Sequence, residues 1–139
     1  MTSISASRSV STDRTDTGLD VVTGAFSYSG SAIAQALMAG GRTVRTLTGH
    51  PQRNGGRSDI EARPLDFDDQ LGLVDSLRGA TTLYNTYWVR FAHRRIDHRL
   101  AVANSRTLFH AARRAGVQRI VHVSITNPSL DSPFPYFRG

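Results

Sequence analysis

The sequence predicts an α/β domain built on a parallel, doubly wound sheet. Short apolar segments alternate with segments of helical periodicity between residues 19 and 124, which is the pattern of strands joined by crossover helices. Glycine, proline and asparagine are concentrated between these segments, where turns are expected. The first strand also leads through a glycine- and serine-containing turn directly into the first helix. Right-handed crossovers then favour the strand order 3-2-1-4-5.

The first three elements follow one another closely. Residues 19–23 form a short apolar strand that ends in a glycine turn. Residues 29–39 carry Ile, Leu and Met on one side and small alanines between them, so we expect a helix. The pair Gly40–Gly41 stops this helix. Residues 42–48 are rich in β-branched side chains and form the second strand.

The central part of the chain repeats this alternation. Residues 50–58 contain one proline, one asparagine and two glycines, which is typical of a loop. Residues 60–65 are expected to form the third strand and residues 68–77 a short helix that ends near Gly79. Residues 81–89, dense in Thr, Tyr and Trp, form the fourth strand.

A long helix and a fifth strand complete the predicted sheet. The helix runs from Asp97, which has the side chain of an N-cap, to Ala115, and Gly116 ends it. The predicted apolar side of this helix consists of Leu100, Ala103, Leu108, Ala111 and Ala112. Residues 119–124 form the fifth strand.

Composition points to one globular domain of residues 18–139 preceded by a flexible tail. Hydrophobic residues make up 39% and charged residues 20% of the 139 residues, which is ordinary for a soluble domain. Residues 1–17 are rich in Ser and Thr and nearly devoid of apolar side chains, so they cannot offset the entropy of ordering them. No apolar run is long enough for a membrane span or a secretory signal. The default expectation is a cytoplasmic protein without membrane partners.

The charge is basic but carried in an unusual way. The net charge is +6, and all 17 basic residues are arginines, because the chain contains no lysine. The arginines are spread along the chain, and no helix-turn-helix or RNA-recognition signature accompanies them. We therefore expect no specific nucleic-acid partner. The absence of Cys excludes disulfides and thiolate metal sites.

The turn from Gly24 to Gly30 has the context that a pyrophosphate-binding turn requires, because it follows a predicted strand and opens a predicted helix. The first amides of a helix and the positive end of its dipole attract an anion. Gly24 would permit the tight turn, Gly30 would let the helix pack closely on the sheet, and Ser27 and Ser29 could donate hydroxyl hydrogen bonds to a phosphate. A strand–loop–helix joint without a ligand uses the same residue types, so the spacing alone leaves both interpretations open.

The segment VTGAFSYSG, residues 22–30, resembles the TGxxGxxG turn of the short-chain dehydrogenase/reductase superfamily. It is most similar to the extended and atypical members, which include nucleotide-sugar epimerases and NmrA-like proteins. Residues 101–124 resemble the long helix and fifth strand of that family almost position by position. The resemblance spans residues 19–139 and implies a Rossmann fold that binds NADP or NAD.

The resemblance also implies which residues bind the cofactor. Asp66 and Phe67 occupy the family's acidic adenine-contacting position, although Asp66 could instead begin a loop or cap a helix. Thr86 and Tyr87 lie where the fourth strand lines the cofactor, with simple strand packing as the alternative. The implied cofactor-binding residues are Gly24, Phe26, Ser27, Tyr28, Ser29, Gly30, Thr48, Asp66, Phe67, Thr86 and Tyr87.

Three residues near the C-terminus are the catalytic candidates. Tyr136 stands where the family has the tyrosine of its YxxxK pair, which acts as general acid and base; the alternative is an aromatic side chain packed in a proline-containing loop. Ser124 and Thr126 are hydroxyls after the fifth strand that could bond a substrate carbonyl or alcohol, and local backbone bonding is their alternative. The sequence does not choose between these two hydroxyls. No histidine has the spacing to carboxylates that would suggest a metal site.

Two departures from the family pattern affect the cofactor. Ser27 replaces the second glycine of the turn, which requires a negative φ at this position. The second strand ends in residues 46–50 (TLTGH) with no carboxylate to bind a ribose 2′-hydroxyl. A 2′-phosphate would therefore not be repelled, and Arg45, Arg53 or His50 could neutralise it. This modestly favours NADP over NAD.

A third departure affects catalysis. In the family a lysine four residues after the tyrosine stabilises the phenolate, but the chain ends at Gly139 and contains no lysine. We therefore expect a truncated domain without its later strands and substrate region, inactive by itself. The leading hypothesis is the cofactor domain of an NAD(P)-dependent oxidoreductase or nucleotide-sugar epimerase that acts on a small-molecule substrate, with a homo-oligomer as the candidate assembly. The alternative is a non-catalytic, NmrA-like dinucleotide sensor.

Overall fold

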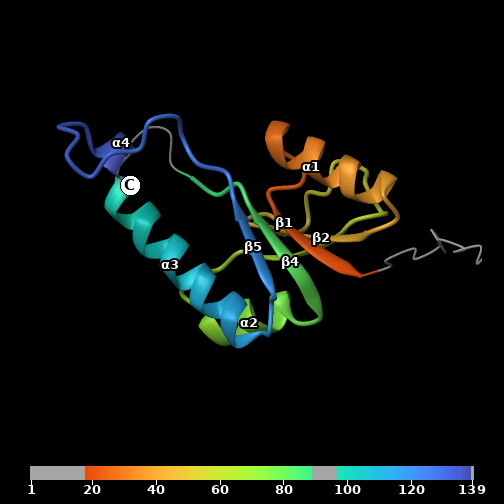
Figure 1. Ribbon diagram of the computed structural model, residues 1–139. Helices are drawn as coiled ribbons and strands as arrows, with labels where there is room; N and C mark the ends of the chain where they lie inside the picture. Colours follow the sequence, from red (N-terminus) through yellow and green to blue (C-terminus); the bar gives the residue numbers. More distant parts are fainter. Residues whose placement is uncertain (1–17, 89–96, 139) are drawn as a thin grey trace, which may run out of the picture.

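A computed structural model describes residues 18–88 and 97–138. These residues form a five-stranded sheet of order β3-β2-β1-β4-β5, in which every neighbouring pair of strands is parallel (Figure 1). The elements are β1 (Leu19–Thr23), α1 (Tyr28–Ala39), β2 (Thr43–Thr48), β3 (Glu61–Pro64), α2 (Gln70–Leu77), β4 (Ala80–Asn85), α3 (His98–Arg114), β5 (Arg119–His122) and α4 (Pro135–Arg138). The predicted Rossmann-type strand order is confirmed. The expected flexible tail, residues 1–17, lies outside the described residues.

The ends of the helices follow the local signals in the sequence. Asp97 caps α3, since its carboxylate accepts a 2.8 Å hydrogen bond from the backbone N–H of Leu100. Gly116 ends the same helix with a φ of +83°, a conformation that glycine adopts without strain. At the end of α1 the left-handed residue is Gly41, with a φ of +82°. Asp69 caps α2, one residue later than the predicted start of that helix.

Several elements differ from the prediction in extent or type. β5 ends at His122 rather than at Ser124, so Ser124 and Thr126 both follow the strand. β4 ends at Asn85 rather than continuing to Val89, which lies outside the described residues. Residues 135–138 form the short helix α4, whereas the prolines around them suggested a loop. Proline is well tolerated in the first turn of a helix, because its missing N–H has no intrahelical partner there.

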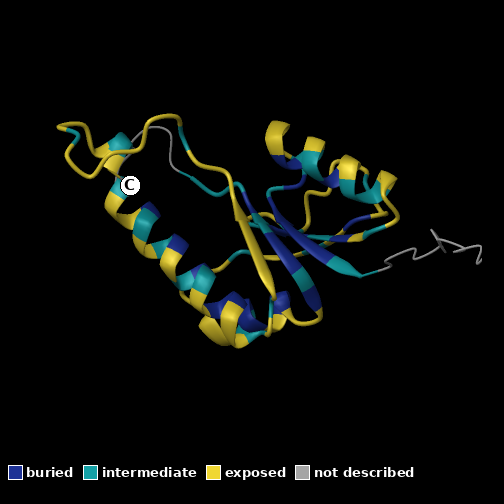
Figure 2. Cartoon of the chain, in the orientation of Figure 1, coloured by how far each residue is buried: buried dark blue, intermediate teal, exposed yellow. Residues whose placement is uncertain are grey.

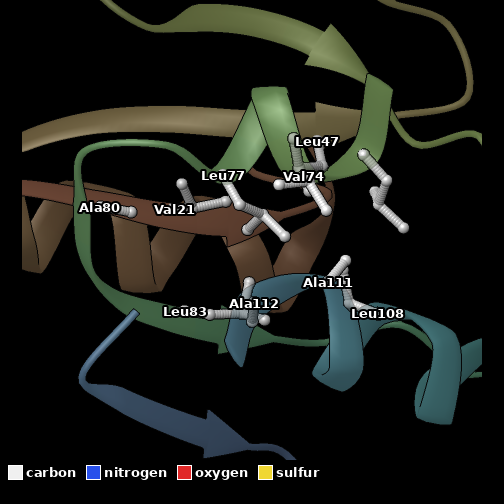
Figure 3. Close-up of a cluster of buried hydrophobic side chains, with 10 residues drawn as sticks. Val21, Leu47, Val74, Leu77, Ala80, Leu83, Leu108, Ala111 and Ala112 are labelled. Carbon is white, nitrogen blue, oxygen red and sulfur yellow. The ribbon is translucent and has the colours of Figure 1, made fainter. Parts of the chain in front are cut away.

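The core lies in two layers on opposite faces of the sheet. α1 covers one face, and α2 and α3 cover the other (Figure 1). The larger cluster lies between the sheet and the α2–α3 pair, and Figure 3 shows its side chains converging from both layers. It consists of Val21, Leu47, Leu73, Val74, Leu77, Ala80, Leu83, Leu108, Ala111 and Ala112. The smaller cluster beneath α1 consists of Val22, Ala25, Ala34, Val44 and Ile60.

The buried side of α3 differs in part from the predicted one. Leu108, Ala111 and Ala112 are buried as expected, but Leu100 is 39% exposed and Ala103 is also exposed. The buried residues in the first half of this helix are instead Ala101 and Ser105. The large core cluster takes its α3 members only from the second half of the helix, beginning at Leu108.

β5 is an edge strand whose four residues are all exposed (Figure 2). It pairs only with β4 in the described structure, and Ile120 and Val121 are each 39% exposed. The sheet therefore presents apolar side chains at this edge. None of the helices in the described parts of the chain has the length and apolar character of a transmembrane span.

A buried ion pair joins β1 to the end of the α1–β2 connection. The guanidinium of Arg42 donates two hydrogen bonds of 2.7 and 2.8 Å to the carboxylate of Asp20. The Asp20 side chain is 2% exposed and the Arg42 side chain 12% exposed. This pair lies at the amino end of the parallel sheet, away from the β1–α1 turn.

Candidate functional site

The β1–α1 turn depends sterically on both of its predicted glycines. Gly24 has a φ of +65°, in the left-handed region. Gly30 is buried, and a Cβ there would lie 2.6 Å from the carbonyl carbon of Gly24 and closer still to its oxygen. Real side chains do not reach such distances from backbone atoms, so α1 can pack against this turn only with glycine at position 30.

Ser27 fits the turn because it is the N-cap of α1. Its φ is −85° and its ψ 170°, so it satisfies the requirement for a negative φ. The Ser27 hydroxyl donates to the carbonyl oxygen of Gly24 at 2.7 Å and accepts from the N–H of Gly30 at 3.4 Å. Tyr28 and Ser29 follow in the exposed first turn of the helix, and the Tyr28 side chain is 95% exposed. Phe26 packs against the small core cluster beneath α1.

Thr46 holds the turn in place from the neighbouring strand. Its buried hydroxyl donates to the carbonyl oxygen of Val22 and accepts from the N–H of Ala25, both at 2.9 Å. This role of Thr46 was not predicted from the sequence. The available signal was a threonine within the apolar strand that neighbours β1 in the predicted order.

A buried polar network crosses the carboxyl ends of β1, β4 and β5. Thr23 donates its hydroxyl to Asn85 Oδ1 at 3.1 Å, and the N–H of Thr86 donates to the Thr23 hydroxyl at 2.7 Å. The Thr86 hydroxyl donates to the carbonyl oxygen of Thr23 at 2.6 Å. Asn85 Oδ1 also accepts from the N–H of Tyr87 at 3.0 Å. Thr86 and Tyr87 are therefore fixed by hydrogen bonding as well as by strand packing.

The orientation of Asn85 sets the protonation of His122. Because Asn85 Oδ1 accepts two donors, its Nδ2 faces His122 Nδ1 at 3.0 Å and must donate to it. The proton of the neutral imidazole is then on Nε2. Although His122 keeps solvent-exposed surface, partial desolvation of its ring lowers its pKa below the ordinary value, which also favours this neutral form. The ring packs edge-on against Phe109 of α3, with centroids 5.7 Å apart.

One cavity lies beside the carboxyl ends of β2 and β3, on the side where the adenine is expected. Its volume is about 460 Å³, and Thr48, Asp66 and Phe67 line it together with Asn104 of α3. Asp66 is not the cap of α2, since Asp69 has that role. The Asp66 carboxylate instead accepts a 2.9 Å hydrogen bond from the backbone N–H of Asp68.

A hydrogen bond that the sequence did not indicate fixes the Tyr87 ring beside this cavity. The rings of Phe67 and Tyr87 lie 4.9 Å apart. Asn104 Nδ2 donates to the Tyr87 hydroxyl at 2.9 Å, which ties α3 to the segment after β4. Asn104 and Tyr87 are 17 residues apart in the sequence, so no local pattern predicts their contact.

A second cavity of 530 Å³ lies beyond β4 and β5. It brings together all three catalytic candidates, Ser124, Thr126 and Tyr136, with the cofactor candidate Thr86. Its remaining described lining residues are Trp88, His122, Val123, Ile125 and Phe137. Residues that are separate in the sequence thus share one cavity.

Arg45 does not occupy the position that the sequence analysis considered for it. Its guanidinium donates to the Glu61 carboxylate at 2.7 Å and to the carbonyl oxygens of Ser76 and Arg78 at 3.0 Å. These partners bind it to β3 and the end of α2, away from the end of β2. His50 and Arg53 remain in the exposed turn after β2, where the N–H of Arg53 donates to the carbonyl oxygen of His50 at 2.9 Å.

Comparison with known proteins identifies the class to which this fold and turn belong. Residues 21–127 match the NAD dependent epimerase/dehydratase family, and the chain belongs to that family. The chain is therefore an NAD(P)-binding, epimerase/dehydratase-like domain of the short-chain dehydrogenase/reductase superfamily.

Individual relatives cover the same region. The chain is 34% identical over 110 residues to sterol demethylase protein B of Methylococcus capsulatus, a match of 75% of this chain and 33% of that protein. A short-chain dehydrogenase/reductase superfamily protein from Agrobacterium tumefaciens, solved with bound NAD, is 25% identical with a TM-score of 0.67. That match covers 86% of this chain and 40% of the solved one. The chain thus spans about a third of the curated relative's length.

A third comparison extends the fold to an NADP(H) complex. Citrobacter sp. triphenylmethane reductase, solved with NADP(H), superposes with a TM-score of 0.66 at 22% identity. The match covers 85% of this chain and 41% of the reductase. Both nicotinamide dinucleotides therefore occur among structures that share this fold.

Proposed function

We propose that this chain holds the dinucleotide of an NAD(P)-dependent oxidoreductase or of a nucleotide-sugar epimerase-like enzyme. The observation that carries the proposal is the β1–α1 turn, where Gly24 and Gly30 bring the amino end of α1 against the carboxyl end of β1. Such a turn presents backbone N–H groups and a helix dipole to a pyrophosphate. The two cavities lie near opposite ends of this edge of the sheet, as an extended dinucleotide requires.

Different residues around the turn are assigned to different parts of the cofactor. We assign Thr48, Asp66 and Phe67 to the adenosine half, because they line the cavity near β2 and β3. The pyrophosphate is assigned to residues 24–30 and the nicotinamide half to Thr86, which lines the second cavity, whereas Tyr87 packs on Phe67 beside the adenosine cavity. A bound nicotinamide would supply hydride transfer.

The catalytic candidates lie where they could act on a substrate hydroxyl. Ser124 and Thr126 each offer a hydroxyl that can donate to a carbonyl oxygen, and the Tyr136 phenol can exchange a proton with it. Both Ser124 and Thr126 line the cavity, so either hydroxyl can hold the substrate oxygen. The 139 residues contain no lysine to stabilise the Tyr136 phenolate. We therefore propose that they bind the cofactor without turnover.

The lack of lysine also supports the second candidate, a non-catalytic NmrA-like dinucleotide sensor. A sensor needs the turn and the adenosine cavity but no proton-transferring phenol. The two candidates differ in the second cavity, since only an enzyme needs it to bind a substrate. In either case we propose a cytoplasmic protein.

NADP is the proposed preference. No carboxylate follows β2 within residues 46–50, and a Cβ at Gly49 would meet no atom within 4 Å, so there is space beside the strand end. His50 and Arg53 lie in the adjoining exposed turn and can approach a 2′-phosphate. A guanidinium offers two parallel hydrogen bonds to such a group.

The test is a titration of the purified chain with NADPH and NADH. Trp88 is the only tryptophan and lines the second cavity, so its energy transfer to the reduced nicotinamide has a single origin. We expect saturable transfer with tighter binding of NADPH, and Arg53→Ala should weaken NADPH several-fold while leaving NADH unchanged. Arg63→Ala, an exposed arginine on β3 paired with Glu61, is the matched control. A chain that is folded by circular dichroism but shows no saturable transfer would contradict the proposal.

A further inference from the structure

The second cavity differs in chemistry from a site for a charged substrate. Its described lining consists of aromatic and aliphatic side chains, hydroxyls and one imidazole, and no Asp, Glu or Arg from residues 18–88 or 97–138 is among them. An ionic ligand would find no opposite charge on these residues with which to pair. The described walls therefore favour an uncharged ligand.

One side of the cavity is a continuous aromatic wall. The rings of Trp88 and Tyr136 lie 6.2 Å apart with their planes at 66°, and those of Tyr136 and Phe137 lie 5.3 Å apart at 88°. His98 stacks on Trp88 from outside the lining, with centroids 5.8 Å apart at 25°. Because each ring is supported by another, the wall presents fixed apolar surface on which a saturated or aromatic ring can lie.

The lining also carries several neutral hydrogen-bond donors. Thr86, Ser124 and Thr126 carry hydroxyls, and His122 keeps its Nε2–H because its Nδ1 accepts from Asn85. The indole Nε1–H of Trp88 is also buried, and among the described residues it has no hydrogen-bond partner. A buried donor without an acceptor costs about 1–3 kcal/mol, so an acceptor atom on a ligand would be stabilised here.

We propose that this cavity binds an uncharged, ring-containing ketone or alcohol that carries no phosphate. Its ring lies on the wall of Trp88, Tyr136 and Phe137, and its oxygen accepts from the hydroxyls of Ser124 and Thr126. The inference rests on the proposed function, because it assigns the substrate class of the same site. It separates this chain from relatives that act on nucleotide sugars, whose pyrophosphate needs cationic partners.

The test uses a set of ligands that share one ring system. 2-Decalone and 2-decalol are compared with decahydronaphthalene-2-carboxylate and with UDP-glucose, each titrated into the full chain with and without saturating NADPH and followed by Trp88 fluorescence. We expect the ketone and the alcohol to bind at least about tenfold more tightly than either charged compound, since a charged ligand finds no ion-pair partner on these walls and a tenfold difference corresponds to about 1.4 kcal/mol. Cofactor binding is measured by energy transfer in the same samples.

Variants locate the bound ligand. Ser124→Ala combined with Thr126→Ala should weaken 2-decalone about fivefold or more, the effect of losing about 1 kcal/mol of hydrogen bonding. Phe137→Leu should weaken it as well, by removing part of the aromatic wall. Ser58→Ala, in the loop before β3 and outside the lining, is the control and should leave the affinity unchanged.

Each outcome decides between the two proposals. Tighter binding of the carboxylate or of UDP-glucose, equal binding of all compounds, or an unchanged affinity in the double variant would overturn the assigned substrate class. If none of the compounds binds while NADPH still gives saturable transfer, the substrate class is wrong and the cofactor domain stands. If a folded chain binds neither NADPH nor the decalin compounds, the proposed function fails and the inference fails with it.

Discussion

The substitution Gly30→Ala tests the steric basis of the cofactor turn. A Cβ at Gly30 would meet the Gly24 carbonyl group and would also lie 3.1 Å from Ala25 Cα. To bring its distance from the Gly24 carbonyl carbon from 2.6 Å to the roughly 3.4 Å of an ordinary contact, α1 must move away from the turn. These neighbours are backbone atoms in a hydrogen-bonded turn, so they cannot rotate aside as a flexible side chain would.

The expected cost has two parts. Inserting a methyl group into a packed site destabilises a protein by about 1–3 kcal/mol. Movement of α1 also loosens the cap at Ser27, whose hydroxyl joins Gly24 to Gly30, and loss of an N-cap costs about 1 kcal/mol. We expect a total loss of about 2–4 kcal/mol in the free energy of unfolding, together with at least about a tenfold loss of dinucleotide affinity.

The assay combines urea unfolding, followed by far-ultraviolet circular dichroism, with energy transfer from Trp88 to NADPH. Gly40→Ala is the matched control, because Gly40 has a φ of −82° and its Cβ would lie 3.4 Å from the nearest atom, the Leu37 carbonyl oxygen. That variant should change stability by no more than about 1 kcal/mol and affinity not at all. The steric argument is refuted if Gly30→Ala unfolds at the wild-type urea concentration and binds NADPH as tightly, or if Gly40→Ala loses as much.

Three further substitutions test the supports of the site. Thr46→Val leaves a buried N–H of the turn without its acceptor and should cost about 1–3 kcal/mol of stability in urea unfolding and weaken NADPH; unchanged values would contradict its anchoring role. Asp20→Asn removes the carboxylate that Arg42 faces at the amino end of the sheet and should cost about 3 kcal/mol without affecting the affinity of the folded fraction for NADPH. The lowered pKa of His122 means that the unfolded chain takes up this proton first, so stability is full above about pH 6.5 and declines below it. His122→Asn should reduce the fall in the urea midpoint between pH 7.5 and pH 5, and an equal fall in both proteins would refute this contribution of His122.

Much of the fold could be predicted because its signals are local. The strand order follows from alternation and handedness, and Asp97 and Gly116 mark the two ends of α3 by their own side-chain and backbone chemistry. The exposure of Leu100 could not be predicted in this way, since helical spacing defines a side of a helix but not how far the neighbouring elements extend along it. Leu100 instead lines the adenosine-side cavity.

The candidate site was predictable where its residues are close in the sequence and unpredictable where they come from different strands. Residues 24–30 form the turn that their spacing indicates, and Ser27 fits it as an N-cap. The bonds of Asn85 to Thr23 and His122 join positions 62 and 37 residues apart, so no pattern within one segment reports them. The direction of Arg45 was missed for the same reason, because Glu61 lies on the paired strand β3.

The two ends of the sheet use polar groups in different ways. At the amino end, Asp20 and Arg42 form a charged pair whose members are nearly buried and satisfy each other. At the carboxyl end the buried polar groups are neutral, and Thr23, Thr46 and Asn85 carry the hydrogen bonds that position the turn and the segment after β4. A fixed charge beneath the turn would strongly bias the potential felt by a bound pyrophosphate, whereas hydroxyls and an amide fix the backbone at little electrostatic cost. Placing the charged pair at the far end of β1 therefore allows stability to be strengthened or weakened there without altering the field at the cofactor turn, which is why Asp20→Asn and Thr46→Val should differ in NADPH affinity.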